Sequence, residues 1–172
     1  MVQTEGYAQR FSKLSDSEKS NNAVCTRARW ALNNRDGVKT EEIYAVDMNT
    51  GEEIARITDQ HFPQGVKRTR QFDSALKKAA TDGSAIMLIH NHPGGSPPSI
   101  SDLNALLSTP NAKGIVAGHD GSIYRYSAPK EKIPQFDFDV AIMKYKGYTY
   151  NTAHEKALHD IAEQYGFEFT KL

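Results

Sequence analysis

The chain has 172 residues, with 21 lysines and arginines against 21 aspartates and glutamates, so its formal net charge is zero. This length suits one domain with an ordinary hydrophobic core, and the neutral charge argues against a non-specific nucleic-acid or membrane-surface binder. No stretch of roughly 18 consecutive apolar residues occurs, so we expect no membrane span. The single cysteine, Cys25, cannot form an internal disulfide, which favours a reducing compartment, and we expect a cytoplasmic protein.

The residue pattern predicts a single α+β domain over residues 1–172, with a mixed β-sheet flanked by helices. Apolar residues at helical spacing predict an N-terminal helix over 11–35. Two short β-rich runs follow at 42–47 and 53–57, and the turn-forming residues 48–51 between them predict an antiparallel hairpin.

A second helix is predicted over 72–79, and the continuous apolar run at 85–89 is typical of a central strand that is buried on both faces. A short helix is expected to begin at Ser99, and a second hairpin is expected over 114–126. The tail over 135–172 predicts two helices, separated at Gly147, and a final edge strand over 167–169. Ligands bind preferentially at the ends of central strands, so the residues after the apolar run are the first candidates for a site.

Two of the six histidines, His90 and His92, directly follow that apolar run. Side chains two residues apart on a strand point the same way, so both can reach one ion. Asp102, in the first turn of the next predicted helix, can supply a third, anionic ligand. Two histidines and one carboxylate leave a fourth tetrahedral position for water, as in catalytic zinc sites. The sequence therefore predicts a Zn²⁺ site at His90, His92 and Asp102.

A simpler explanation exists for part of this pattern. Ser99 and Asp102 have the spacing of a capping box, in which each side chain satisfies a backbone N–H of the other at the start of a helix. Capping accounts for the serine and the aspartate, but it does not account for two histidines at one strand end. The two explanations are compatible, and both stay open at this point.

The pattern His-x-His-Pro at 90–93, followed by Ser-x-x-Asp at 99–102, resembles the JAMM family of zinc metalloproteases, also called JAB or MPN-plus. The resemblance covers the predicted sheet, roughly residues 41–126, and implies a JAMM/JAB-like (cytidine-deaminase-like) architecture. The loop between the second histidine and the serine is one residue shorter than is usual in the family. With the glycine-rich hairpin that follows, it is similar to JAB-like domains of bacterial mobile elements and phages.

The resemblance implies hydrolysis of a peptide or isopeptide bond through a zinc-bound water. A glutamate just before an early strand is the family's general base; Glu42, which directly precedes Ile43, is our choice over Glu41, which would face the opposite side of the strand. Ser99 would donate a hydrogen bond to the oxyanion. The expected partner is a protein or peptide substrate, with ubiquitin-like proteins as one class.

Two other functions are consistent with the resemblance. One is a non-catalytic interaction or assembly module of a phage or mobile element, and the other is a DNA-associated protein of the RadC-like branch, against which the neutral charge counts. The basic residues at 67–70 are expected to form a solvated helix face. His61 and His119 lie in predicted loops. His154 and His159 are five residues apart on a predicted helix, so they cannot hold one ion and are assigned to a solvated face.

Overall fold

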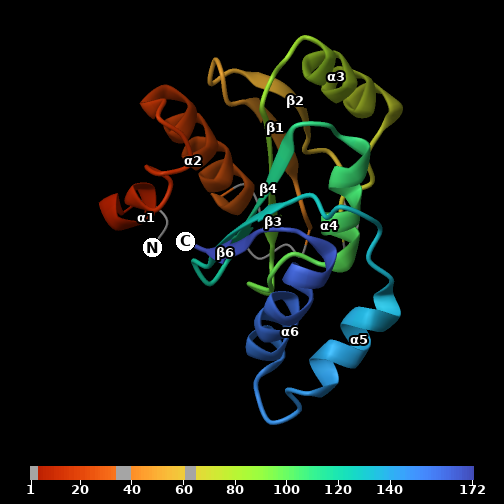
Figure 1. The fold of residues 1–172 in the computed structure, drawn as a ribbon. Coiled ribbons are helices and arrows are strands. Elements are labelled where there is room, and N and C mark those ends of the chain that lie inside the picture. The colour runs from red at the N-terminus through yellow and green to blue at the C-terminus, as the bar shows by residue number, and fades with distance from the viewer. Residues whose placement is uncertain (1–3, 34–39, 61–64) are drawn as a thin grey trace.

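The computed structural model describes residues 4–33, 40–60 and 65–172. It contains a six-stranded mixed sheet with helices on both faces, which confirms the predicted α+β class (Figure 1). The helices are α1 (Glu5–Gln9), α2 (Glu18–Asn33), α3 (Arg70–Thr81), α4 (Ile100–Ala105), the short 3₁₀ helix η1 (Leu106–Ser108), α5 (Gln135–Met143) and α6 (Tyr150–Tyr165). The strands are β1 (Ile43–Asp47), β2 (Glu53–Ile57), β3 (Ile86–His92), β4 (Ala112–Gly118), β5 (Ile123–Ser127) and β6 (Phe169–Lys171).

The strand order across the sheet is β2-β1-β3-β4-β5-β6. Strands β3 and β4 are parallel, and every other neighbouring pair is antiparallel. Because parallel strands need a crossover connection, the chain passes through α4 and η1 between β3 and β4. This crossover begins at the carboxyl end of β3, where both histidines of the predicted site lie.

The sheet separates two hydrophobic cores. Met87 and Ile89 of β3 pack in the core under α1 and α2, while Ile86 and Leu88 pack in the core under α3, α4, α5 and α6. Side chains alternate along a strand, so His90 and His92 share the face of Leu88. The two histidines therefore lie on the side of the sheet that the later helices cover.

The strand β3 extends three residues beyond the predicted 85–89 and includes both histidines. The extra residues pair with β4 as far as His92 opposite Gly118. Neither histidine lies in a loop, because the neighbouring strand supplies hydrogen-bond partners for their backbone. The rigid strand holds both side chains in one orientation.

The N-terminal region differs from the single predicted helix over 11–35. It forms two helices, α1 and α2, and the predicted end at residue 35 lies outside the described residues. The backbone N–H of Ser20 donates to Ser17 Oγ (3.2 Å), and that of Ser15 donates to Asn21 Oδ1 (3.0 Å). Such short polar side chains compete with helical backbone bonds and favour a helix start, so α2 begins at Glu18.

The remaining elements follow the predicted pattern with small shifts. Both hairpins are present, and the C-terminal tail forms two helices with a break that includes Gly147, as expected. The edge strand lies two residues later than predicted, at β6, where Phe169 pairs with Tyr126 of β5. The reason is that α6 ends at Gly166, whose φ of +63° turns the chain back towards the sheet.

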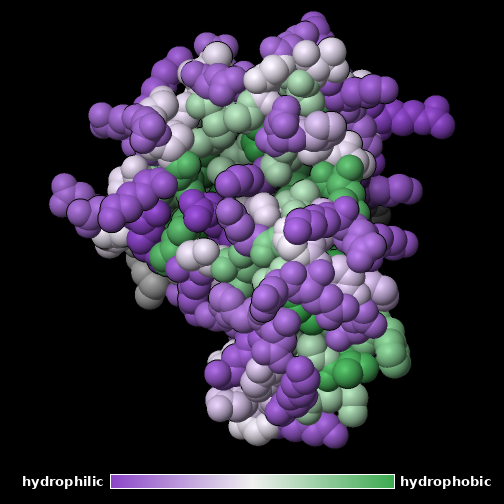
Figure 2. All heavy atoms as spheres, viewed as in Figure 1, coloured by the Kyte–Doolittle hydropathy of each residue, from purple (hydrophilic) through white to green (hydrophobic). Residues whose placement is uncertain are grey.

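The surface is mostly polar, with apolar side chains gathered over α5 at the lower right of Figure 2. The exposed apolar residues there are Phe136, Val140 and Met143, which follow one another at helical spacing. Helix α5 packs on α6 at the edge of the domain, so its outer face stays open (Figure 1). No helix in the described part of the chain is long and apolar enough to cross a membrane.

We predict that Ile89→Ala, in the middle of β3, lowers the free energy of unfolding by about 2–5 kcal/mol, because it leaves a cavity in a fully buried position. Val140→Ala, at a side chain that is 47% exposed, is the control and should change it by less than about 0.5 kcal/mol. Urea denaturation of both variants measures the difference. Equal losses in the two variants would contradict the position of β3 at the centre of the fold.

Candidate functional site

Three predicted ligands meet at the carboxyl end of β3. The Nε2 atoms of His90 and His92 lie 3.1 Å apart. Asp102, in the first turn of α4, places Oδ1 3.5 Å from Nε2 of His90 and Oδ2 3.5 Å from Nε2 of His92. Zinc bonds of about 2.0–2.2 Å in a tetrahedral site require ligand atoms about 3.3–3.6 Å apart. The two carboxylate–histidine distances match this spacing, and the two histidine nitrogens lie slightly closer together than it requires.

A fourth side chain, the acidic Glu41, completes this cluster. Glu41, His90 and His92 each offer a ligand atom, and these atoms all lie within 4.8 Å of one another. The pairing of β1 with β3 explains this position. Ile43 lies opposite His90, and continuing the antiparallel register by two residues places Glu41 opposite His92.

The structure does not bring Glu42 to the histidines, contrary to the sequence-based choice. Glu42 is 2% exposed, and its carboxylate accepts a hydrogen bond from the Tyr44 hydroxyl (2.6 Å). Its backbone N–H donates to Oδ1 of Asn91 (2.8 Å). Tyr44 packs in the core under α1 and α2, so Glu42 lies on the opposite face of the sheet. Adjacent strand residues point to opposite faces, and the register assigns the site to Glu41.

The electrostatics of the cluster favour an ionised carboxylate. Burial by itself raises the pKa of Asp102, but the neighbouring His90 and His92 outweigh it and lower that pKa well below its usual range. Burial also lowers the pKa of His92, yet the hydrogen bond and charge of Asp102 raise it above the ordinary value. The carboxylate thus attracts positive charge, which either a proton on histidine or a metal ion can supply.

The second ring nitrogen of His92, Nδ1, also has polar contacts. Nδ1 lies 2.9 Å from the carbonyl oxygen of Ser96 and 3.0 Å from the Ser96 hydroxyl oxygen. A proton on Nδ1 would be donated to this carbonyl, which leaves Nε2 free to face Asp102. Metal-binding histidines are commonly oriented by such a hydrogen bond from the other ring nitrogen.

The capping box predicted as a simpler explanation is present. The backbone N–H of Asp102 donates to Ser99 Oγ (3.1 Å), and the backbone N–H of Ser99 donates to Asp102 Oδ2 (2.7 Å). The Ser99 hydroxyl also donates to Oδ2 at 2.7 Å. Ser99 therefore orients the carboxylate that faces the histidines, so one pair of residues begins α4 and shapes the site.

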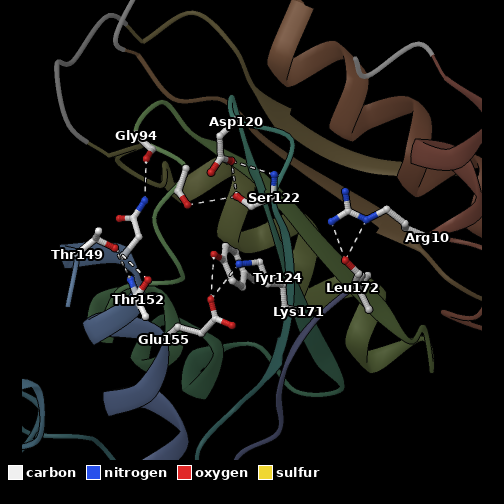
Figure 3. A network of polar contacts seen from close by, with 12 residues as sticks. Arg10, Gly94, Asp120, Ser122, Tyr124, Thr149, Thr152, Glu155, Lys171 and Leu172 are labelled. Carbon is white, nitrogen blue, oxygen red and sulfur yellow. Dashed lines mark hydrogen bonds and ion pairs between the residues drawn. The ribbon is translucent and has the colours of Figure 1, made fainter. Parts of the chain in front are cut away.

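The loop over 93–98, between β3 and α4, is held by the C-terminal helix α6. Nδ2 of Asn151 donates to the carbonyl of Gly94 (3.1 Å), and Nε2 of His154 lies 3.1 Å from the carbonyl of Pro98 (Figure 3 shows the first contact). His154 is buried, so the sequence-based assignment of this histidine to a solvated face is wrong. Burial lowers the pKa of His154 to about 4, which keeps its ring neutral.

The turn between β4 and β5 supports the same loop. Ser122 Oγ donates to the carbonyl of Gly95 (3.2 Å) and contacts Asp120 Oδ1 at 2.6 Å (Figure 3). Gly95 has a φ of +66°, and a Cβ there would lie 2.4 Å from Cγ of Asp120. Only glycine fits at this position without displacing the acidic side chain. The loop is therefore fixed at both ends and in the middle.

The cluster lines a cavity of about 810 Å³. The polar lining is Glu41, His90, His92, Ser99 and Asp102, and the apolar walls include Ile43, Val66, Leu88, Ala105 and Leu106. Arg68 and Tyr126 also line the cavity. Sequence reasoning missed both, because they are far from the motif along the chain and only the fold brings them there.

Arg68 does not belong to a solvated helix face, as had been expected for residues 67–70. Its side chain is 17% exposed, and Nη1 and Nη2 donate to the Ala105 carbonyl (3.3 Å) and Thr109 Oγ1 (3.0 Å).

Cys25 is buried in the core under α2, and burial raises the pKa of its thiol, so no reactive thiolate is expected there. His61 lies outside the described residues.

The chain matches no family model, no curated protein and no solved structure. The resemblance carried by residues 90–93 and 99–102 therefore stands on those residues alone. The chemistry of the cluster and of the cavity that it lines is the basis on which a function can be inferred.

We predict that His154→Phe weakens zinc binding about 10-fold or more, because the ring still packs but no longer holds the Pro98 carbonyl. His154→Gln should retain most of the affinity, since its amide can donate to the same oxygen. Competition with a chromogenic chelator measures the affinity. His159→Phe, at an exposed position on the same helix, is the control. Unchanged affinity in a folded His154→Phe protein would refute the positioning role.

Proposed function

We propose that this protein is a zinc-dependent amide hydrolase, a JAMM-type metallopeptidase or isopeptidase. The observation that carries the proposal is the meeting of two histidines and two carboxylates in the lining of one cavity. Three separate segments supply them: His90 and His92 from β3, Asp102 from α4, and Glu41 from the residues before β1.

The position of the cluster in the fold supports a JAMM/JAB-like architecture. The histidine pair ends a central strand, the aspartate follows from the next helix, and the glutamate precedes the antiparallel neighbour of that strand. This is the arrangement that the resemblance at 90–93 and 99–102 implies. The site also lies at the carboxyl end of a parallel strand pair, where α/β sheets commonly bind ligands.

When bound, Zn²⁺ supplies a Lewis acid that polarises a carbonyl and lowers the pKa of water to about 7. His90, His92 and Asp102 are the side chains that would hold the ion. Glu41 is within reach as the general base. Its carboxylate takes a proton from the attacking water as the C–O bond forms, and it returns that proton to the amide nitrogen as the C–N bond breaks.

Ser99 has a positioning role in this proposal. Its backbone N–H and its hydroxyl both donate to Asp102, and these bonds set the direction of the carboxylate. The predicted donation to the oxyanion would require the hydroxyl to leave Asp102 during the reaction. The contact with Asp102 is therefore the role that the geometry supports for Ser99.

We predict that the purified protein carries about one zinc ion per chain and that His92→Ala and Asp102→Ala lose it. Both changes remove a ligand from the cluster. Elemental analysis by mass spectrometry measures the metal content, with His119→Ala as the control because that histidine contacts Asn91 on the other face of the sheet. A wild-type protein that stays metal-free after incubation with zinc would rule out the catalytic proposal.

We predict that Glu41→Gln retains zinc but slows hydrolysis about 10²- to 10⁴-fold, because the amide cannot accept the proton. Glu42→Gln is the matched variant on the opposite face, and it should keep activity while losing stability. A tryptic peptide mixture of serum albumin is the probe, with cleavage followed by mass spectrometry. If Glu42→Gln is the inactive variant, our assignment of the base is wrong. A zinc-loaded wild type that cleaves none of these peptides would favour the assembly module.

A further inference from the structure

The cavity contains a polar atom that the proposed chemistry does not use. Tyr126 is 2% exposed and lines the cavity, and no described residue forms a hydrogen bond with its hydroxyl. A hydroxyl that faces a cavity and has no protein partner forms its hydrogen bonds with water or with a ligand. The free hydroxyl of Tyr126 therefore points to a ligand group in the cavity.

A glycine on the neighbouring strand leaves space for the ring of Tyr126. Tyr126 lies opposite Gly114 of β4, and a Cβ at Gly114 would come within 2.1 Å of Cζ of Tyr126. The far end of the ring therefore rests over Gly114. Leu88 of β3, which pairs with Gly114 on the other side, also lines the cavity. The ring thus crosses β4 towards the strand that carries the histidines.

Arg68 brings a positive charge to the same cavity. Its Nε donates to Asp73 Oδ1 (2.6 Å), and its two terminal nitrogens donate to the Ala105 carbonyl and to Thr109. A guanidinium has five N–H donors, so three bonds leave two donors unused. The existing bonds fix the orientation of the guanidinium, and the Asp73 carboxylate neutralises part of its charge.

The charges around Tyr126 favour a protonated hydroxyl. Burial raises the pKa of Tyr126 well above its usual value, and the negative charges of Asp102 and Glu41 add to this effect while Arg68 opposes it. The hydroxyl therefore keeps its proton and can donate a hydrogen bond. A donor that lines the same cavity as a guanidinium suits an anionic oxygen acceptor such as a carboxylate.

We propose that Tyr126 and Arg68 bind the free C-terminal carboxylate of a short peptide or an acylated amino acid, with its scissile amide at the histidine end of the cavity. The apolar walls would take the side chain next to that carboxylate. The placement of the amide rests on the proposed function, whereas carboxylate binding does not. The proposal favours removal of one or two C-terminal residues over cleavage of an isopeptide bond in a folded partner.

The dimensions agree with a short substrate. Leu88 and His90 are two residues apart on one face of β3, which is about 7 Å along a strand. Two substrate residues span a similar length in an extended conformation. A cavity of about 810 Å³ also falls within the range of small-ligand sites.

The test compares two probes, N-acetyl-alanyl-leucine with a free carboxylate and the same compound as its carboxamide. Binding is followed by NMR titration of the full chain in the presence of a chelator, so that no metal ion can bind the carboxylate. We expect the carboxylate probe to bind about 10-fold or more tightly than the carboxamide. This preference should fall at least about threefold in Tyr126→Phe and in Arg68→Met.

Tyr124→Phe is the matched control, because it removes the same atom from the same strand. Its hydroxyl lies 3.5 Å from Oε2 of Glu155 and is absent from the cavity lining (Figure 3). Arg68→Lys tests whether the guanidinium geometry is needed, since lysine keeps the positive charge but lacks the planar group with several N–H donors. Equal binding of the two probes, binding of neither, or a preference that survives in Tyr126→Phe and Arg68→Met would overturn the proposal.

The outcomes separate this inference from the proposed function. A protein that binds no zinc but prefers the carboxylate probe refutes the hydrolase proposal and retains the carboxylate site. A zinc-binding, amide-cleaving protein without this preference retains the hydrolase proposal and refutes the carboxylate site. In that case the contacts of Arg68 with Ala105 and Thr109 serve only to tether the loop before α3.

Discussion

The pairing of β3 with its two neighbours is the constraint on which the rest of the site depends. Buried on both faces, β3 is held in one register by hydrogen bonds to β1 and β4. A shift of one residue would exchange its faces and move both histidines into the other core. The same register decides which glutamate joins them, because Ile43 lies opposite His90. Strand pairing that stabilises the fold thus also assembles the cluster.

The segment after β3 combines a structural and a chemical role. Asp102 caps α4 together with Ser99, and the same carboxylate lies 3.5 Å from each histidine ring. The loop before it is one residue shorter than is usual in the family it resembles, and it is held by α6 and by the turn after β4. These supports come from sequence-distant elements, so the C-terminal tail belongs to the site.

The cavity places the cluster beside groups of different chemistry. Its lining includes the groups suited to a metal ion and a proton, the hydroxyl of Tyr126, the guanidinium of Arg68 and apolar side chains. Such a combination suits a small amide with a negative end more closely than a long extended partner. The net charge of zero gives no indication of this arrangement, because the acidic groups of the cluster and the basic Arg68 lie in one cavity and have opposite charges.

The sequence by itself determined the fold class, the central strand and the facing pair His90 and His92, since these follow from local hydrophobicity and the two-residue period of a strand. It also determined the spacing of Ser99 and Asp102, which a short helix start enforces. Only the tertiary structure decided between Glu41 and Glu42, because strand register depends on partners far along the chain. For the same reason the cavity contacts of Arg68 and Tyr126 and the buried position of His154 could not be predicted.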